Sequence, residues 1–280
     1  MRFKARRLAF GHGLIDALDE ATYLTLHALG LAADQLAPHL DLRPTPKKIE
    51  KVLRLFERRI RERKPAAYLT GEAWLGKFRF HVDERVIVPR SYIAELLRND
   101  LAPWIPRPGK VRAVLDLCTG SGCLAVMLAH SFPRAHIDAA DISRDALKVS
   151  RRNVAEYALQ DRVRLVRSDL FAALAGRRYD LIVSNPPYVT AASMRRLPPE
   201  YRHEPRLALA GGHDGLEVTR AILRGAAAHL NTNGLLVVEI GHNRARVERA
   251  FPRTAFTWPC TRAGDDCVFL ISREELTAAI

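Results

Sequence analysis

Residues 185–188 are the stretch of this chain with the clearest chemical potential. They follow the run Tyr-Asp-Leu-Ile-Val-Ser at 179–184, which is typical of a buried strand. Proline lacks a backbone N–H and holds φ at about −65°, so a strand cannot continue through two prolines. The chain must therefore leave the sheet here as a stiff loop. The predicted catalytic residues of this loop are Asn185, Pro186, Pro187 and Tyr188.

This loop has the groups needed to hold a planar NH₂ group at the carboxyl end of a strand, where open α/β sheets bind their ligands. The side-chain oxygen of Asn185 and a proline carbonyl can each accept one hydrogen of that group. The ring of Tyr188 can stack on its plane. The alternative is a loop that merely ends a strand, because Asn-Pro is a common turn signal.

A glycine-rich loop precedes it, with the sequence Asp-Leu-Cys-Thr-Gly-Ser-Gly at 116–122. It lies between a predicted strand at 113–117 and a predicted helix at 122–131. Glycines at such a turn let the backbone approach a ligand closely and turn sharply into the helix. The dinucleotide fingerprint needs a third glycine, and Ala125 stands in its place. By itself, the loop is weak evidence for a nucleotide site.

Two acids narrow the choice of ligand. Asp141 follows the second predicted strand, about 20 residues after the glycines, where a carboxylate reaches the ribose hydroxyls of a nucleoside. Asp116, before the glycines, would repel a phosphate. A cationic nucleoside without phosphate suits both acids, and S-adenosylmethionine is such a ligand.

A third acid follows the third predicted strand. Asp169 can reach the adenine amino group, with Leu170 or Phe171 against the ring; equally, Asp169 can cap a helix. The residues predicted to bind the cofactor are Asp116, Cys118, Thr119, Gly120, Ser121, Gly122, Asp141, Ile142, Asp169, Leu170 and Asn185.

The elements that position these residues alternate between strand and helix from about residue 111. This alternation predicts a Rossmann-like, mostly parallel sheet with helices on both faces, closed by an antiparallel edge hairpin. The predicted strands are at 113–117, 136–140, 163–167, 180–184, 234–240, 254–259 and 267–271. The predicted helices are at 122–131, 144–158 and 215–229.

The part of the chain before this pattern has a different periodicity. Apolar residues recur at helical spacing from about 14 to 64, and residues 68–88 alternate as in short strands. We therefore predict an N-terminal helical domain at 1–66, a β-hairpin linker at 67–90 and an α/β domain at 91–280.

Composition is that of a globular protein with an unusual charge. The 280 residues are 48% hydrophobic and 27% charged, and no apolar run approaches the roughly 20 residues of a membrane span. The four cysteines lack metal-ligand spacing and predict reduced thiols in a cytosolic protein. The net charge of +13 favours a polyanionic partner such as nucleic acid or a ribonucleoprotein. The alternative is a proteome that uses arginine as its general soluble residue.

Together, the glycine loop, Asp141 and residues 185–188 resemble class I S-adenosylmethionine-dependent methyltransferases that act on planar nitrogen. The match is closest to the HemK-type protein glutamine N5-methyltransferases. Three further motifs resemble the branch that modifies a glutamine of ribosomal large-subunit protein three: Val-Ile-Val-Pro-Arg-Ser at 86–91, Glu-Tyr-Arg-His-Glu-Pro-Arg at 200–206 and Phe-Gly-His-Gly at 10–13. Tyr92 departs from that branch, which usually has proline there. The resemblance runs from about residue 10 to residue 272. It implies that the helical domain at 1–66 docks the substrate and that residues 91–280 form the S-adenosylmethionine-dependent methyltransferase domain.

The resemblance implies methyl transfer from S-adenosylmethionine to the side-chain N5 of a glutamine, with S-adenosylhomocysteine as the product. It implies ribosomal large-subunit protein three as the partner, alone or with ribosomal RNA or an assembly intermediate. A monomeric, cytoplasmic enzyme without a metal is expected. The substrate-binding residues are then Arg90, Glu204, Pro205 and Arg206, with Arg206 paired to an acid.

Other functions stay open at this point. The release-factor branch of the same family is one, although it is expected to have Arg-Pro and a Thr-Glu pair near residue 90. A DNA adenine-N6 or cytosine-N4 methyltransferase also needs a site for a planar NH₂, but no segment is large enough to recognise and flip bases. A non-enzymatic RNA-binding protein would have a degenerate cofactor site. His203 and His213 are interpreted as structural or solvated.

Overall fold

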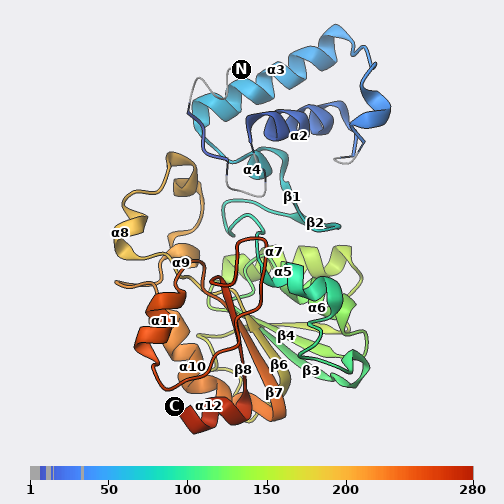
Figure 1. Ribbon diagram of the computed structural model, residues 1–280. Helices are drawn as coiled ribbons and strands as arrows, with labels where there is room; N and C mark the ends of the chain where they lie inside the picture. Colours follow the sequence, from blue (N-terminus) through green and yellow to red (C-terminus); the bar gives the residue numbers. More distant parts are fainter. Residues whose placement is uncertain (1–6, 11–13, 15, 33–34, 280) are drawn as a thin grey trace.

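The computed structural model describes residues 7–10, 14, 16–32 and 35–279. Of the motif at 10–13, Gly11, His12 and Gly13 therefore lie outside the described residues. A large sheet with helices on both faces forms one part of the molecule (Figure 1). A smaller helical part lies at one end, beyond a two-stranded hairpin (Figure 1).

The large sheet has six strands in the order β5-β4-β3-β6-β7-β8. The first five strands of this order run parallel to one another, and β8 runs antiparallel to β7. This confirms the expected fold class, a mostly parallel Rossmann-like sheet with an antiparallel edge strand. The strands are β3 (Ala113–Leu117), β4 (His136–Asp141), β5 (Val163–Arg167), β6 (Tyr179–Ser184), β7 (Leu230–Glu239) and β8 (Val268–Ser272).

Helices cover both faces of this sheet because its strands send alternate apolar side chains to two cores. Val114 belongs to the core that α6 and α7 cover, whereas Leu115 and Leu117 belong to the core that α10 and α12 cover. All three side chains are fully buried. The covering helices are α6 (Cys123–Ser131), α7 (Arg144–Glu156), α10 (Glu217–His229) and α12 (Arg273–Ala279).

The N-terminal part consists of α2 (Ala17–Leu29), α3 (Pro46–Glu62) and α4 (Ala66–Thr70). Asp16 begins α2, because its carboxylate accepts the N–H groups of Leu18 at 2.7 Å and Asp19 at 3.0 Å. Apolar side chains of α2, α3 and α4 form a small core of their own. The helical spacing at 14–64 therefore predicts these helices correctly.

A buried ion cluster connects these helices to the part of the molecule that contains the large sheet. Arg59 of α3 is fully buried and donates to Glu20 of α2 at 2.6 Å and to Glu200 at 3.3 Å. Glu200 is also fully buried and belongs to η4 (Pro199–His203), in the segment after β6. Buried charges are stable in proteins when they are paired, so α2, α3 and η4 hold one another in place.

The hairpin of β1 (Glu72–Leu75) and β2 (Phe78–His81) is attached to the sheet part through α7. The buried Asn153 of α7 accepts the His81 N–H at 2.7 Å and donates to the His81 carbonyl at 3.0 Å. The other short elements are η1 (Ala37–His39), α5 (Ile93–Leu96), η2 (Leu97–Asn99), η3 (Pro108–Lys110), α8 (Ala191–Met194), α9 (Arg206–Leu209) and α11 (Arg244–Ala250).

Two expectations about the edge of the sheet are wrong. Residues 254–259 form no strand, and only Thr257 pairs with Leu270 in an isolated bridge, because Pro252 and Pro259 bracket the segment and remove backbone donors. β7 begins at Leu230, four residues before the predicted start. Within the described residues, no helix is both long enough and apolar enough to cross a membrane.

Candidate active site

A cavity of about 420 Å³ lies at the carboxyl ends of β3, β4, β5 and β6. Nine of the residues predicted to bind the cofactor line it, although they come from four separate segments. The remaining two, Asp116 and Gly122, do not line it. The nine lining residues are Cys118, Thr119, Gly120, Ser121, Asp141, Ile142, Asp169, Leu170 and Asn185.

Asp141 ends β4 and holds the glycine loop in place. Its Oδ2 accepts the Gly120 N–H at 2.9 Å, and its Oδ1 accepts the Ser143 N–H at 2.8 Å. Each carboxylate oxygen keeps a second lone pair, so the oriented carboxylate can still accept two ligand hydroxyls. Burial raises the pKa of Asp141, and the backbone donors oppose that shift.

The glycine loop needs its second glycine for packing. Gly122 precedes α6 with a φ of 78°, and a Cβ there would lie 3.2 Å from the Cβ of Ser150 on α7. Ser150 Oγ also donates to the Gly120 carbonyl at 2.6 Å. Gly122 therefore allows the glycine loop to pack closely against α7. Cys118 lines the cavity with a φ of 60°, a conformation that non-glycine residues rarely adopt outside sites where it is needed.

Asp116 lies beneath this loop and supports it from below. Its carboxylate is buried and accepts the Thr119 hydroxyl at 2.5 Å. Burial raises the pKa of Asp116 to about 7, and the nearby Asp141 adds to the shift. Asp116 therefore supports the glycine loop from within the core.

Replacing Asp116 by asparagine should flatten the dependence of stability on pH. The pKa of this carboxyl is 3.8 when unperturbed and about 7 in the folded protein, so the folded state binds the extra proton between these values. The free energy of unfolding therefore falls as pH rises from about 4 to about 7, by at most about 4 kcal/mol from this group. Urea unfolding of wild type and Asp116→Asn at several pH values measures the difference. The exposed Asp161→Asn is the control, and equal slopes in all three proteins would contradict the assignment.

Asp169 and Leu170 lie on the cavity, and the alternative of a helix cap for Asp169 is not what the structure has. No helix begins directly after Asp169 in the described chain; the segment forms a turn, in which Ser168 Oγ accepts the Ala173 N–H at 3.0 Å. Phe171 does not line the cavity; its ring stacks on His229 with centroids 4.6 Å apart. Leu170 is therefore the apolar residue available to a bound ring.

Asn185 lies where two cavities meet. It lines the large cavity and also a second one of about 210 Å³, to which Pro186, Tyr188 and Tyr201 contribute. Asn185 Nδ2 donates to the Arg90 carbonyl at 3.2 Å. With its nitrogen held in this way, the side chain offers Oδ1 as the acceptor. Pro187 lines the large cavity only.

Glycines hold the backbone around Tyr188 in close contact. A Cβ at Gly211 would lie 2.7 Å from Tyr188 Cα, and one at Gly241 would lie 2.8 Å from the tyrosine ring. Asn243 Nδ2 donates to the Tyr188 carbonyl at 3.1 Å. The tyrosine hydroxyl points to Glu239, with an O–O distance of 3.4 Å, and burial raises the Tyr188 pKa. Tyr188 thus stays neutral and forms a fixed wall of the smaller cavity.

The predicted substrate residues have different surroundings from one another. Arg90 lines both cavities, and its guanidinium is paired with the buried Glu204 at 2.5 and 2.7 Å. Pro205 lines the large cavity. The expected pairing of Arg206 with an acid is wrong: its side chain is exposed and pairs with no acid among the described residues. Of the two acids of this motif, Glu204 pairs with Arg90 and Glu200 pairs with Arg59.

Sequence reasoning missed Glu239, the last residue of β7. This carboxylate is buried and accepts the Ser91 hydroxyl at 2.5 Å and the Tyr92 N–H at 2.8 Å. Burial raises its pKa to about 7. The one signal in the sequence was an acid at the end of an apolar run, at 235–240. The glycines that pack on Tyr188 carried no signal at all.

Among the residues that the structure describes, no histidine lines either cavity. His203 Nδ1 lies 2.9 Å from Glu84 Oε1 and its Nε2 lies 3.0 Å from the Glu62 carbonyl, which is a structural role. His213 lines neither cavity.

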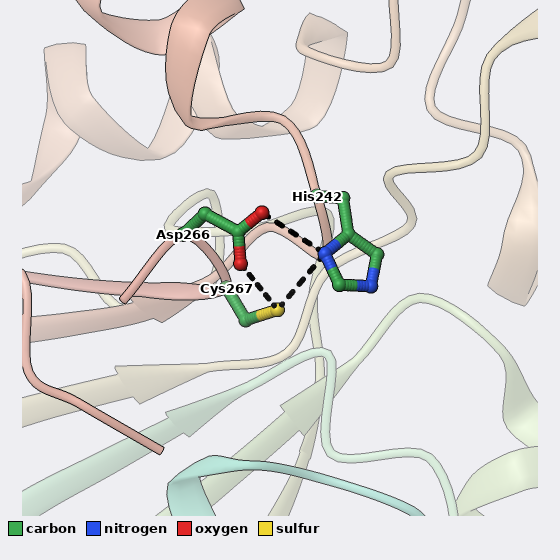
Figure 2. Close-up of side chains that lie close together, drawn as sticks. All are labelled: His242, Asp266 and Cys267. Carbon is green, nitrogen blue, oxygen red and sulfur yellow. Dashed lines mark hydrogen bonds and ion pairs between the residues drawn. The ribbon is translucent and has the colours of Figure 1, made fainter. Parts of the chain in front are cut away.

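His242, Asp266 and Cys267 form a separate cluster beside the ends of β7 and β8 (Figure 2). Asp266 Oδ2 lies 3.0 Å from His242 Nδ1, and Cys267 Sγ lies 3.3 Å from Asp266 Oδ1. These are donor types that zinc can use. Burial, with Asp266 nearby, raises the pKa of Cys267 to about 12, so the thiol stays protonated and donates to the carboxylate. Hydrogen bonds therefore account for the cluster.

The donor set of the large cavity fits a nucleoside cofactor without phosphate. Carboxylates of Asp141 and Asp169 lie on one side, and apolar side chains such as Leu117 and Leu124 form much of the wall. Such a cavity can take hydroxyl donors and a flat ring. The neighbouring smaller cavity can then present a planar group to Asn185.

Comparison with known proteins finds one matching family model and relatives of high sequence identity. A family model described as the methyltransferase small domain matches residues 96–197. A protein of Bordetella pertussis named ribosomal protein uL3 glutamine methyltransferase is 56% identical over 275 residues, covering 98% of this chain and 92% of that protein. A protein of the same name from Burkholderia pseudomallei is 53% identical over 284 residues, covering 99% and 92%.

Solved structures share the fold at low identity. A methyltransferase from Pyrococcus furiosus has a TM-score of 0.51 at 17% identity, covering 71% of this chain and 90% of that one. The hMettl16 catalytic domain in complex with MAT2A 3′UTR hairpin 6 has a TM-score of 0.52 at 16% identity, covering 69% and 74%. At these identities the likeness extends to the fold alone.

Proposed function

Because the chain belongs to the family of ribosomal protein uL3 glutamine methyltransferases, we propose that it methylates the side-chain amide nitrogen, N5, of a glutamine in ribosomal large-subunit protein three. The methyl donor is S-adenosylmethionine. The observation that carries the proposal is the position of Asn185, which lines both the large cavity and the smaller one beside it. One cavity suits the cofactor, and the other suits the amide that receives the methyl group.

The large cavity holds the cofactor through residues of three strand ends. The Asp141 carboxylate accepts the ribose hydroxyls, since the Gly120 and Ser143 N–H groups already orient it. Asp169 and Leu170 lie where the base would be held. When bound, S-adenosylmethionine supplies an electrophilic methyl group on a sulfonium.

Asn185 prepares the glutamine amide for methyl transfer. An amide nitrogen is a poor nucleophile because its lone pair is delocalised into the carbonyl. Asn185 Oδ1 and a carbonyl of the 185–186 segment each accept one N–H hydrogen, which holds the nitrogen in line and stabilises the positive charge that develops on it. Transfer of the methyl group leaves a cation on the amide nitrogen, which is strongly acidic and loses one proton to water, giving the neutral N-methylamide. The site therefore needs no strong general base.

Labelled methyl transfer tests this function directly. The protein and labelled S-adenosylmethionine are added to a cell extract that lacks the activity, and the labelled peptide is located. The proposal expects one labelled glutamine in ribosomal large-subunit protein three. Label in a release factor would move the enzyme to the other branch of the family. Label in DNA would overturn the proposal.

The helix α3 supports a finer proposal, contact with ribosomal RNA or an assembly intermediate. Lys47, Lys48 and Lys51 are exposed near its start, and none of them forms an ion pair with the described residues. Arg58 and Arg61, farther along, both pair with Glu62. Free lysines on one helix end are suited to phosphate contacts, which release counterions and depend on salt.

Reversing these three charges should slow methylation of the ribosomal particle only. The triple variant K47E/K48E/K51E should lose about tenfold in kcat/KM on the particle at moderate salt, and its activity should depend less steeply on salt. Activity on isolated protein three should stay within about twofold. The matched control reverses three exposed cations, Arg107, Lys110 and Arg134, which precede the amino ends of β3 and β4. Equal loss in both triple variants would contradict an RNA contact by α3.

A further inference from the structure

The segment 88–92 passes between two buried glutamates that come from distant parts of the chain. On one side, Glu204 Oε1 accepts the Val88 N–H at 2.9 Å and one Arg90 N–H at 2.5 Å. Glu204 Oε2 accepts a second Arg90 N–H at 2.7 Å. The Glu204 side chain is fully buried, so this two-point pair is shielded from water.

On the other side, Glu239 holds the next two residues. Its Oε2 alone accepts both the Ser91 hydroxyl at 2.5 Å and the Tyr92 N–H at 2.8 Å. Its Oε1 lies 3.4 Å from the Tyr188 hydroxyl. Glu239 therefore contacts both the segment 88–92 and the tyrosine of the loop at 185–188.

Between these two anchors lies the carbonyl of Arg90, which accepts the Asn185 Nδ2 at 3.2 Å. This contact decides which way the amide of Asn185 faces. A flipped amide would bring its oxygen against the Arg90 oxygen, and two acceptors repel one another. The position of one backbone carbonyl therefore selects the orientation in which Asn185 Oδ1 is available to the substrate.

We propose that Glu204 and Glu239 are positioning residues for methyl transfer, which fix the Arg90 carbonyl and through it the amide of Asn185. The inference rests on the proposed function, because it assigns Asn185 Oδ1 to the substrate amide. Neither glutamate lines the large or the smaller cavity, so neither touches cofactor or substrate directly. Their effect on the reaction passes through the segment 88–92.

The two glutamates should respond differently to the same conservative change. At Glu239 both donors converge on one oxygen, so glutamine can still accept both with its amide oxygen. At Glu204 both oxygens face Arg90 N–H groups, so glutamine would turn its own NH₂ against the guanidinium. Glu239→Gln should therefore restore most of the activity that Glu239→Ala loses, and Glu204→Gln should not restore that of Glu204→Ala.

Kinetics of these four variants test the proposal. Both alanine variants should lose about 10- to 100-fold in kcat, the size expected for a misplaced catalytic group. The Kd of S-adenosylmethionine should change less than about threefold. Thermal unfolding shows whether each variant is folded.

The control is Asp180→Asn. Asp180 lies near the amino end of β6, whereas Asn185 follows its carboxyl end. Like Glu239 Oε2, Asp180 Oδ2 accepts two hydrogen bonds, from the backbone N–H groups of Arg112 at 2.7 Å and Ala113 at 3.1 Å. This variant loses a comparable carboxylate but should keep wild-type kcat. Folded alanine variants of Glu204 and Glu239 with wild-type kcat would overturn the proposal.

A second measurement does not depend on activity. The side-chain NH₂ signals of Asn185 in a nitrogen-15 NMR spectrum are identified by their loss in Asn185→Ala. They should shift in Glu204→Ala and Glu239→Ala and stay in place in Asp180→Asn. Unshifted signals would overturn the positioning role, whether or not the wild-type protein methylates glutamine. If the signals shift but the wild-type protein methylates no glutamine, the positioning role stands and the proposed function is wrong.

Discussion

Replacing Asn185 by alanine should lower kcat for glutamine methylation by about 1000-fold while the Kd of S-adenosylmethionine changes by less than about threefold. The alanine removes the Oδ1 acceptor at the junction of the two cavities. Loss of one preorganised hydrogen-bonding group that stabilises charge in a transition state costs about 100- to 1000-fold in kcat. Single-turnover kinetics and calorimetric titration of the cofactor measure the two quantities separately.

Asn185→Asp makes the same test more specific. Aspartate keeps an acceptor oxygen but has no donor for the Arg90 carbonyl, which accepts from Nδ2 in the wild type. Its second oxygen would face that carbonyl, so we expect this variant to be inactive as well. Turnover within about tenfold of wild type in either variant would contradict the role of Asn185 as the acceptor of the substrate amide.

Replacing Asp141 by alanine should raise the Kd of S-adenosylmethionine by at least about 100-fold. The variant loses the acceptor for two ribose hydroxyls, which would then be buried without a partner. It also frees the Gly120 N–H, so the glycine loop loses its anchor. Calorimetric titration measures the Kd, and the KM for the cofactor should rise in parallel.

The effect of Asp141→Ala should be confined to the cofactor side. At saturating S-adenosylmethionine, kcat should recover to within about tenfold, since Asn185 is unchanged. Asp145→Asn is the control, because Asp145 is an exposed acid of α7 that pairs with Lys148 and does not line the cavity. Unchanged cofactor affinity in Asp141→Ala would show that the large cavity binds something else.

The sequence predicts well the parts of this fold that depend on local patterns. Apolar residues recur along β3 to β6 and along the helices between these strands. Their run length and spacing indicate directly whether a segment is a strand or a helix. The two loops of the site are also local, because glycine at 120 and 122 and proline at 186 and 187 restrict the backbone where they stand. These features place nine of the predicted cofactor residues on one cavity.

The contacts that orient the site are not local, and the sequence does not reveal them. Arg90 and Glu204 are 114 residues apart, and Ser91 and Glu239 are 148 apart. No periodicity links such pairs, so the sequence predicts Arg90 and Glu204 as substrate residues without predicting that they pair with one another. The missing strand at 254–259 has a local cause instead, because Pro252 and Pro259 remove backbone donors, and only Thr257 pairs with Leu270.

The ion cluster around Glu200 limits how the sequence of this protein can evolve. Glu200 takes its charged partner from α3, while Glu204, in the same short segment, takes its partner from the edge of the catalytic cavity. Arg63, which follows α3, also pairs with Glu200. A chimera that received its N-terminal helices from a relative without both arginines would therefore bury an unpaired carboxylate in the segment that contributes Tyr201 to the smaller cavity. Residues 20, 59, 63 and 200 must therefore be inherited as a set, and the N-terminal helices cannot be exchanged between relatives as a separate module.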